Sequence, residues 1–324
     1  MLKVVKASIY DSFMCTASGC PDNCCNNEWN IVIDEETYGK YKALGIPDMD
    51  SKVTATLPHV IIKHDKKCPF ITEDGLCIFH RDYGEKYLSN TCKSYPRFVS
   101  TYGDTYLETL GMSCPAVAQL VISLTEYLDF EEKVYYEDKA ELRKDFPALP
   151  IEKETREHIS LFVGGGVKRH IYEEIYKSVS DKELIPDISI PKTIENLAKW
   201  FADNSCSKYY SALFENDYCV SCGERKELDL TEMIIEESYP WFASNFNRLF
   251  FFEHYMLESL KQEPQYTSVV LECAIVWELC VAALTFRRLQ GDYIDEETIV
   301  ECTYKLMRLI DHDENILKEL SKVV

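Results

Sequence analysis

The sequence lacks several features that would assign it to a common class. Its first residues, MLKVVKASIYDSF, contain no long apolar segment of the kind found in secretory signals, so we expect a cytoplasmic protein. The most apolar run, residues 269–285, is interrupted by Glu272 and Glu278, which favours a buried helix over a membrane span. Basic residues are also few, with 35 Lys and Arg against 55 Asp and Glu and a formal net charge of −20. Nucleic-acid binding needs a basic surface and is therefore disfavoured.

Cysteine, in contrast, is abundant, with 14 residues in a chain of 324. In a reducing compartment, clustered cysteines are more often metal ligands than disulfides. Several adjoin turn-forming residues, such as Pro69 and Gly75, and loops of this kind hold thiolates at fixed angles. The N-terminal cysteines are therefore candidate metal ligands: Cys15, Cys20, Cys24, Cys25, Cys68, Cys77, Cys92 and Cys114.

The residues themselves leave the metal open. Cys24 and Cys25 are adjacent and point in different directions on a helix or a strand, so both bind only at a large site or at two sites. A cluster with bridging sulfides is larger than a zinc ion, which favours an iron–sulfur centre. Four thiolates suit zinc as well, and the spacing does not decide which four hold a given centre. We expect His64 and His80 to be neighbours of the cysteines rather than ligands.

Further cysteines lie in the second half of the chain. Cys219 and Cys222 form a C-x2-C pair, with Cys206 upstream. A single pair of this kind is a weak indication of a second metal site, because no matched pair accompanies it. Cys273 and Cys280 lie seven residues apart in the apolar run and are expected in the core.

Short elements are predicted among the N-terminal cysteines. Residues 30–34 are predicted to form a strand, and Asp34 to cap the helix that follows. Residues 81–90 are predicted to form one amphipathic helix. Pro115 suits the first turn of a helix that continues through Val121.

Long helices are predicted from residue 122 onward. They include residues 239–261, residues 264–289 and a final helix capped by Asp295. The final helix has an apolar face at helical spacing, which carries Ile299, Cys302, Leu306, Leu309 and Ile310.

The predicted fold is mainly α, with two domains. Residues 1–122 are predicted to form a small irregular α+β cysteine-rich metal-binding domain, and residues 123–324 a helical bundle. A boundary linker is predicted near residues 146–152, where Pro147 and Pro150 interrupt the helical pattern. No internal repeat is present.

A series of spaced motifs resembles the flagellin lysine-N-methylase family. The motifs, over about residues 10–122, are YDSF, C-x4-C-x3-CC, W-x-I-x-ID-x-x-TY, CPF-x5-GLC, TC-x-x-YPR and SCP-x-VA. A later segment, YPWFASNFNRLFFFEHY, resembles the aromatic helix of that family. The family is part of a wider group with a cysteine-rich, zinc- or iron-chelating domain.

The resemblance implies a protein-lysine N-methyltransferase that uses S-adenosylmethionine and contains an iron–sulfur cluster, 4Fe–4S, with zinc as the alternative metal. It implies flagellin or a similar surface protein as the substrate. It also implies that the eight N-terminal cysteines hold the metal, with Tyr95, Pro96 and Arg97 beside them. The cysteine spacing departs from that of radical enzymes, so polar methyl transfer is expected. The alternative function is a non-catalytic, metal-binding cytosolic interaction module.

Methyl transfer to lysine requires that the amine lose a proton, and the sequence does not identify the group that removes it. Free lysine has a pKa of about 10.4 and is charged at neutral pH, whereas the attacking amine must be neutral. A carboxylate, a tyrosine or desolvation must therefore remove the proton. With 21 Tyr and many Glu, no spacing singles out the base or the methyl-donor pocket.

Overall fold

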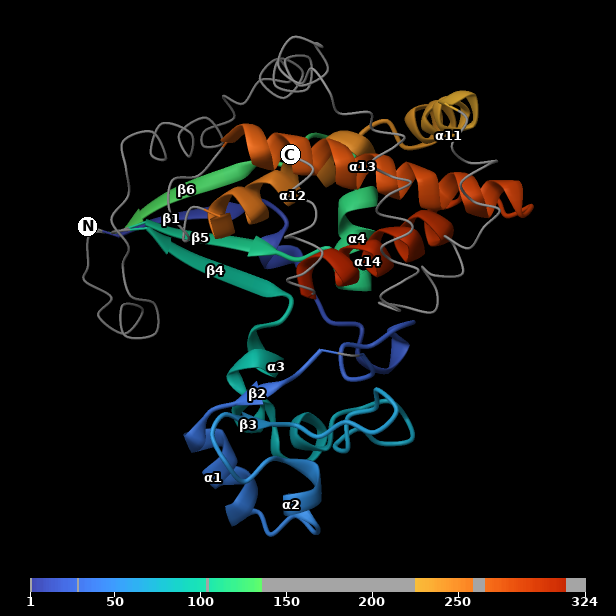
Figure 1. Cartoon of the computed structure of the whole chain (residues 1–324). Helices are drawn as coiled ribbons and strands as arrows, with labels where there is room; N and C mark the ends of the chain where they lie inside the picture. The colour runs from blue at the N-terminus through green and yellow to red at the C-terminus, as the bar shows by residue number, and fades with distance from the viewer. Residues whose placement is uncertain (1, 28, 103–104, 136–224, 259–265, 313–324) are drawn as a thin grey trace. The chain divides into compact units, whose positions relative to one another are not determined.

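The computed structural model (Figure 1) describes residues 2–27, 29–102, 105–135, 225–258 and 266–312. The chain divides into two compact units. The second unit consists of Met14–Pro96 with Cys114–Ala116, and the rest of the chain belongs to the first. The predicted cysteine-rich domain, residues 1–122, thus spans parts of both units. The predicted linker near residues 146–152 lies outside the described residues.

A mixed four-stranded sheet forms the centre of the first unit, with the strand order β4-β5-β1-β6. Strand β1 (Leu2–Ala7) is parallel to β5 (Thr105–Leu110) and antiparallel to β6 (Phe130–Tyr135). Strand β4 (Arg97–Tyr102) is antiparallel to β5. A short 3-10 turn, η1 (Tyr10–Ser12), follows β1. The prediction of a mainly α chain did not include this sheet.

Helix α12 (Phe242–Glu258) packs on this sheet. The ring of Phe252 stacks on Phe130 of β6, with 4.1 Å between the ring centroids. Arg248 Nε donates to the backbone carbonyl of Leu128 at 2.7 Å, just before β6 begins. Buried aromatic contacts and this hydrogen bond therefore join the C-terminal helices to strands from the N-terminal part of the chain.

The remaining described helices of this unit are α4 (Pro115–Ile122), α11 (Arg225–Ser238), α13 (Tyr266–Leu289) and α14 (Glu296–His312). Helix α13 contacts α11, α12 and α14, so the predicted helical bundle is confirmed in part. None of the described helices has the length and hydrophobicity needed to span a membrane. As predicted, the apolar face of α14 is buried at Ile299, Cys302, Leu306, Leu309 and Ile310.

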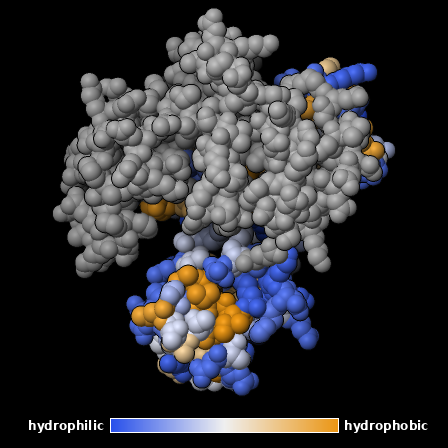
Figure 2. All heavy atoms as spheres, viewed as in Figure 1, coloured by the Kyte–Doolittle hydropathy of each residue, from blue (hydrophilic) through white to orange (hydrophobic). Residues whose placement is uncertain are grey.

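The second unit contains short elements separated by loops. Strands β2 (Val32–Ile33) and β3 (His59–Val60) form an antiparallel pair. The helices are α1 (Glu35–Ala43), α2 (Met49–Lys52) and α3 (Asn90–Ser94), and the single helical turns are η2 (Ala17–Gly19), η3 (Phe79–Tyr83) and η4 (Glu85–Tyr87). In Figure 2 the visible face of this unit shows hydrophobic residues gathered among hydrophilic ones.

The prediction of a single helix over residues 81–90 is wrong. Gly84 has a φ of 88°, in the left-handed region that glycine tolerates, and it separates η3 from η4. The next helix, α3, begins where the predicted one was expected to end. Ser89 caps it, because its side chain accepts a hydrogen bond from the backbone N–H of Cys92 at 3.2 Å.

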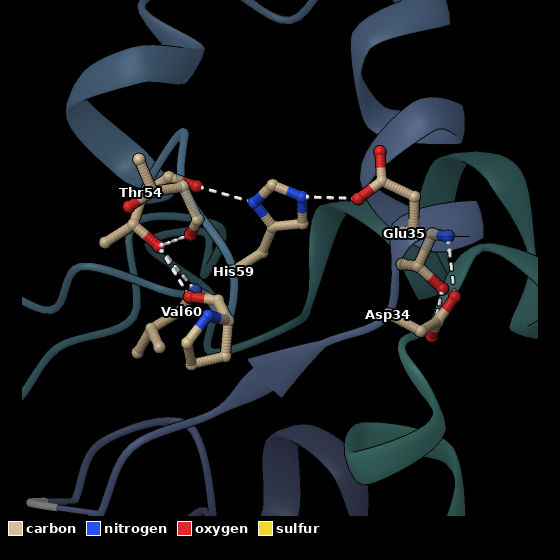
Figure 3. A network of polar contacts seen from close by, with 8 residues as sticks. Asp34, Glu35, Thr54, His59 and Val60 are labelled. Carbon is tan, nitrogen blue, oxygen red and sulfur yellow. Dashed lines mark hydrogen bonds and ion pairs between the residues drawn. The ribbon is translucent and has the colours of Figure 1, made fainter.

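Figure 3 shows the polar network that joins α1 to β3. The buried His59 ring lies 2.8 Å from the backbone carbonyl of Thr54 through Nδ1 and 2.9 Å from a carboxylate oxygen of Glu35 through Nε2. Asp34 caps α1 as predicted, accepting from the Thr37 N–H at 2.8 Å. These contacts fix the start of α1 against β3, beside the core that contains the cysteines.

Candidate metal centre

Thiols from four separate segments of the chain share one small core in the second unit. Cys68 belongs to its buried cluster, and Cys25, Cys77 and Cys92 pack against that cluster. A thiolate at Cys24 would raise the pKa of Cys25, Cys77 and Cys92, and one at Cys68 would raise the pKa of Cys25 and Cys92, so these groups are electrostatic neighbours. We call these five residues the thiol cluster: Cys24, Cys25, Cys68, Cys77 and Cys92.

The first loop of the thiol cluster is shaped by Asn23. Its side-chain oxygen accepts hydrogen bonds from the backbone N–H groups of Cys25 and Asn26, both at 3.1 Å, as in an Asx turn. The backbone carbonyl of Cys25 then accepts from the N–H of Cys68 at 3.1 Å. Two cysteines that lie 43 positions apart are thereby held side by side through their backbones.

The loop before Cys77 is a tight turn closed by Thr72. The Thr72 hydroxyl donates to the Leu76 carbonyl at 2.8 Å and accepts from the Leu76 N–H at 3.1 Å. Gly75 has a φ of 77°, which suits glycine and confirms the turn expected at this position. The turn brings Cys77 back opposite Ile71, with which it forms an isolated bridge.

Cys92 is placed by the first turn of α3. Ser89 is fully buried and holds the Cys92 N–H, as described above. The hydroxyl of Thr91 donates to the Val32 carbonyl at 2.9 Å and ties α3 to β2. The orientation of this cysteine therefore depends on a helix cap and on one contact with a strand.

Aromatic side chains pack in the same core as the thiols. Tyr41 and Phe79 stack with centroids 3.7 Å apart, and Phe70 lies against Phe79 at 4.7 Å. All three rings are buried. This packing excludes water from one side of the cluster, so charged thiolates would be poorly solvated there.

The electrostatics follow from that burial. Desolvation raises the pKa of Cys68 to about 11 and that of Cys92 to about 12, and it also raises the pKa of Cys77. A hydrogen bond with Cys24, followed by burial, raises the pKa of Cys25. These four thiols are therefore held in their neutral form when no metal is bound, and a bound metal would displace their protons.

Lys63 provides a positive charge close to the thiols. Its Nζ donates to the Asn27 side-chain oxygen at 2.7 Å and to the Asn27 carbonyl at 3.2 Å. Burial lowers the pKa of Lys63, while the neighbouring Cys68 and Cys25 act in the opposite direction. Sequence reasoning did not single out Lys63, because a single lysine after a short apolar stretch is ordinary.

The other predicted ligands differ in their surroundings. Cys15 is exposed, Cys20 is half-buried, and Cys114 is buried. His64 and His80 are exposed. Among the described residues, no three His, Cys, Asp or Glu side chains are arranged tightly enough to hold a metal ion.

The cysteines of the second half divide between the core and the part that is not described. Cys273 and Cys280 are buried in α13, as predicted. The possible second site at Cys206, Cys219 and Cys222 lies outside the described residues.

Arg97 of the YPR motif contacts the YDSF motif in the first unit, whereas Tyr95 and Pro96 belong to the second unit. The guanidinium of Arg97 lies over the rings of Tyr10 and Phe13, 5.6 and 4.8 Å from their centroids. Burial, followed by the charge of Glu108, raises the pKa of Tyr10 to about 12. Arg97, at the start of β4, therefore packs against the segment that follows β1.

The chain is similar to curated proteins of Salmonella. It is 28% identical over 158 residues to the flagellar biosynthetic protein FliU of Salmonella muenchen, which covers 45% of this chain and 92% of that protein. It is also 28% identical over 160 residues to lysine-N-methylases of Salmonella typhimurium and Salmonella choleraesuis, covering 45% of this chain and 39% of each relative. The chain thus spans about two fifths of the lysine-N-methylases it matches.

No family model matches the chain, and no solved structure is similar to it. The similarity to the lysine-N-methylases and FliU nevertheless confirms the resemblance to the flagellin lysine-N-methylase family that the motifs indicate.

Proposed function

From this similarity, we propose that the chain is an S-adenosylmethionine-dependent N-methyltransferase for lysine side chains of flagellin or a similar surface protein, with an iron–sulfur cluster. The observation that carries the proposal is the joint occurrence of two features. The chain is similar to proteins named lysine-N-methylase, and four thiols of its second unit share one small core, with Cys24 as an electrostatic neighbour.

The thiol cluster suits a thiolate-held centre by its donor chemistry. A 4Fe–4S cluster or a structural zinc ion uses four thiolates, and five are grouped here. In the structure the thiols are hydrogen-bonded or packed as neutral groups, so binding requires their deprotonation. Lys63 would offset part of the resulting negative charge.

The centre has a structural role that follows from the loops. The second unit has few regular elements, and its cysteine loops are joined through single hydrogen bonds and a compact aromatic core. A metal centre would crosslink these loops and contribute its binding free energy to folding. The proposed chemistry at the substrate is polar, with a neutral lysine amine attacking the sulfonium methyl group in line.

The test uses the full chain purified without oxygen. Incubation with S-adenosylmethionine and folded flagellin is expected to add methyl groups to flagellin lysines, as read by peptide mass spectrometry. Reactions without the methyl donor, and with Cys92→Ala protein, are the controls. Metal and acid-labile sulfide analysis of the same sample is expected to give iron with sulfide.

Two results would count against the proposal. Stoichiometric zinc without iron or sulfide would refute the iron–sulfur cluster but not the transfer reaction. Metal-loaded protein that neither binds the methyl donor nor modifies any lysine would favour the metal-binding interaction module, which needs no donor pocket.

A further inference from the structure

Lys63 is a half-buried cation whose ammonium group is anchored to the first loop of the thiol cluster. Its Nζ donates to the side-chain oxygen of Asn27 at 2.7 Å and to the carbonyl of the same residue at 3.2 Å. Asn27 is only 7% exposed, and its side-chain nitrogen donates to the carbonyl of Cys24. The Nζ also lies 6.0 Å from the ring centroid of Trp29. Asn27 therefore links the ammonium group directly to the loop that carries Cys24.

A tight turn joins this lysine to one of the cysteines. His64 and Lys67 form an antiparallel bridge, in which the backbone N–H of each donates to the carbonyl of the other, at 3.2 and 2.9 Å. The two residues between them, Asp65 and Lys66, have φ values of 49° and 68°. Two consecutive positive φ values are typical of the type I′ turn of a β-hairpin. One arm of this turn continues into the lysine and the other into Cys68, and opposite residues of a hairpin present their side chains on the same face.

The conformation of the turn is held by contacts on both of its arms. Asp65 and Lys66 are in the left-handed region, which is unfavourable for residues other than glycine. Such conformations persist where the surrounding structure fixes them, and they are concentrated at functional sites. On one arm the Cys68 N–H donates to the Cys25 carbonyl at 3.1 Å, and on the other the ammonium is bound by Asn27. Both arms are thus tied to the same loop.

The charges of the lysine and of the thiols act on one another. Burial lowers the pKa of Lys63, and thiolates at four cysteines would raise it, in the order Cys68, Cys25, Cys24 and Cys92. The reverse effect is present at Cys68, where burial raises the pKa of the thiol and the charge of Lys63 lowers it. One ammonium group therefore interacts with four of the five members of the thiol cluster.

We propose that the Lys63 ammonium is the counter-ion of the metal centre and raises both its metal affinity and its reduction potential. This inference rests on the proposed function, because it requires the thiol cluster to hold a metal. Four thiolates around an iron–sulfur cluster or a zinc ion leave a net negative charge, and burial makes that charge unfavourable. A fixed cation offsets it, and it favours the more negative, reduced state of a cluster over the oxidised state. Lys63 is thus a positioning residue that binds no metal itself.

The first experiment measures metal affinity in the reduced, metal-free full chain, with cobalt(II) as the probe. Thiolates bound to cobalt(II) give an intense charge-transfer absorption, which reports ligation whatever the native metal is. Lys63→Met removes the charge and keeps most of the apolar stem, whereas Lys63→Arg keeps the charge. We expect the cobalt dissociation constant to rise about tenfold in Lys63→Met and to stay close to the wild-type value in Lys63→Arg. Lys67→Met, at an exposed lysine of the same turn, is the matched control and should bind as the wild type does.

The second experiment measures the reduction potential of the anaerobically purified, iron-loaded protein by a redox titration followed by electron paramagnetic resonance. At a given potential, we expect Lys63→Met to shift the ratio of reduced to oxidised cluster about tenfold toward the oxidised form, which is about 59 mV for one electron. Lys63→Arg should restore the wild-type potential. If circular dichroism shows that Lys63→Met does not fold, Lys63→Gln is measured instead, because it keeps an N–H donor for Asn27 without the charge.

The results separate the counter-ion from the proposed function. A folded, uncharged variant with the wild-type cobalt affinity and reduction potential overturns the counter-ion and leaves the proposed function standing. Equal losses in Lys63→Met and Lys63→Arg also overturn it, because they would show that the contacts of the side chain matter rather than its charge. Wild-type protein that binds neither cobalt(II) nor iron refutes the metal centre and the counter-ion with it. Tenfold weaker cobalt binding in Lys63→Met, in a protein that methylates no lysine, supports the counter-ion and refutes the transfer reaction.

Discussion

Removing the Cys68 thiol should flatten the alkaline stability profile of the metal-free protein. Cys68 is buried, and desolvation raises the pKa of its thiol from 9.0 to about 11. The folded state therefore holds this proton at a pH where the unfolded chain has released it. The resulting stabilisation is complete below about pH 9 and is lost as the pH rises through about 11.

The magnitude follows from the difference between the two pKa values. Each pH unit over which one extra proton is held corresponds to about 1.4 kcal/mol. For Cys68 the total loss is about 3 kcal/mol, spread between about pH 9 and pH 11. Because a domain is typically stable by only about 5–15 kcal/mol, a change of this size is readily measured.

The assay is urea unfolding of chelator-treated, reduced protein at several alkaline pH values. Cys68→Ala leaves a small cavity that costs on the order of 1 kcal/mol at every pH. The test is therefore how steeply the free energy of unfolding falls with pH, rather than its value at one pH. Across this range the variant should lose about 3 kcal/mol less of that free energy than the wild type. Cys302→Ala, in the core of α14, is the control for removing a buried thiol elsewhere. Identical slopes in wild type and Cys68→Ala would refute the argument that burial holds this proton.

Three further predictions concern the same cluster and the surface charge. Cys77→Ala and Cys92→Ala should give metal-poor or insoluble protein, whereas Cys302→Ala keeps its metal and loses on the order of 1 kcal/mol; equal metal content in all three would contradict the ligand assignment. Ser89→Ala removes the cap that holds the Cys92 N–H, so thermal unfolding should show a loss of about 1 kcal/mol, and metal analysis should show weaker retention. If the acidic surplus of the chain steers a lysine-bearing substrate, methylation of folded flagellin should slow between low and high salt, because the Debye length falls from about 10 Å at 0.1 M to about 3 Å at 1 M; a flat rate would exclude steering.

Local signals in the sequence predicted local structure well. Asp34 and Asp295 cap helices as expected, since each side chain accepts a backbone N–H at the start of its helix. Pro115 begins α4, where its missing N–H costs nothing. The failure at residues 81–90 is also local, because Gly84 adopts a left-handed conformation that an amphipathic pattern does not reveal.

The central sheet was missed because its pairing is not local. β1 at the N-terminus lies between β5 and β6, whose residues follow about 100 positions later in the chain. The period-2 alternation of β1 is short and includes two lysines, so it gave only a loose pattern. Helix α12, which packs on this sheet, comes from still later in the chain. The residue pattern within one segment does not predict a contact with so distant a segment.

The candidate metal centre, too, was predictable from the sequence only in part. The thiol cluster was predictable as a set because cysteines are rare enough for their grouping to be informative. The sequence did not show which cysteines belong to the cluster. That depends on contacts between distant segments and on local caps, such as the backbone hydrogen bond from Cys68 to Cys25 and the cap at Ser89.

The motifs that carry the family resemblance act mainly through the scaffold. Ile33 and Tyr38, from the motif around Asp34, are buried in the core that the cysteines share. Phe70 of the CPF motif packs on the same rings, and Gly75 of the GLC motif closes the turn before Cys77. Substitutions at these positions should therefore disturb metal retention first and methyl transfer only as a consequence.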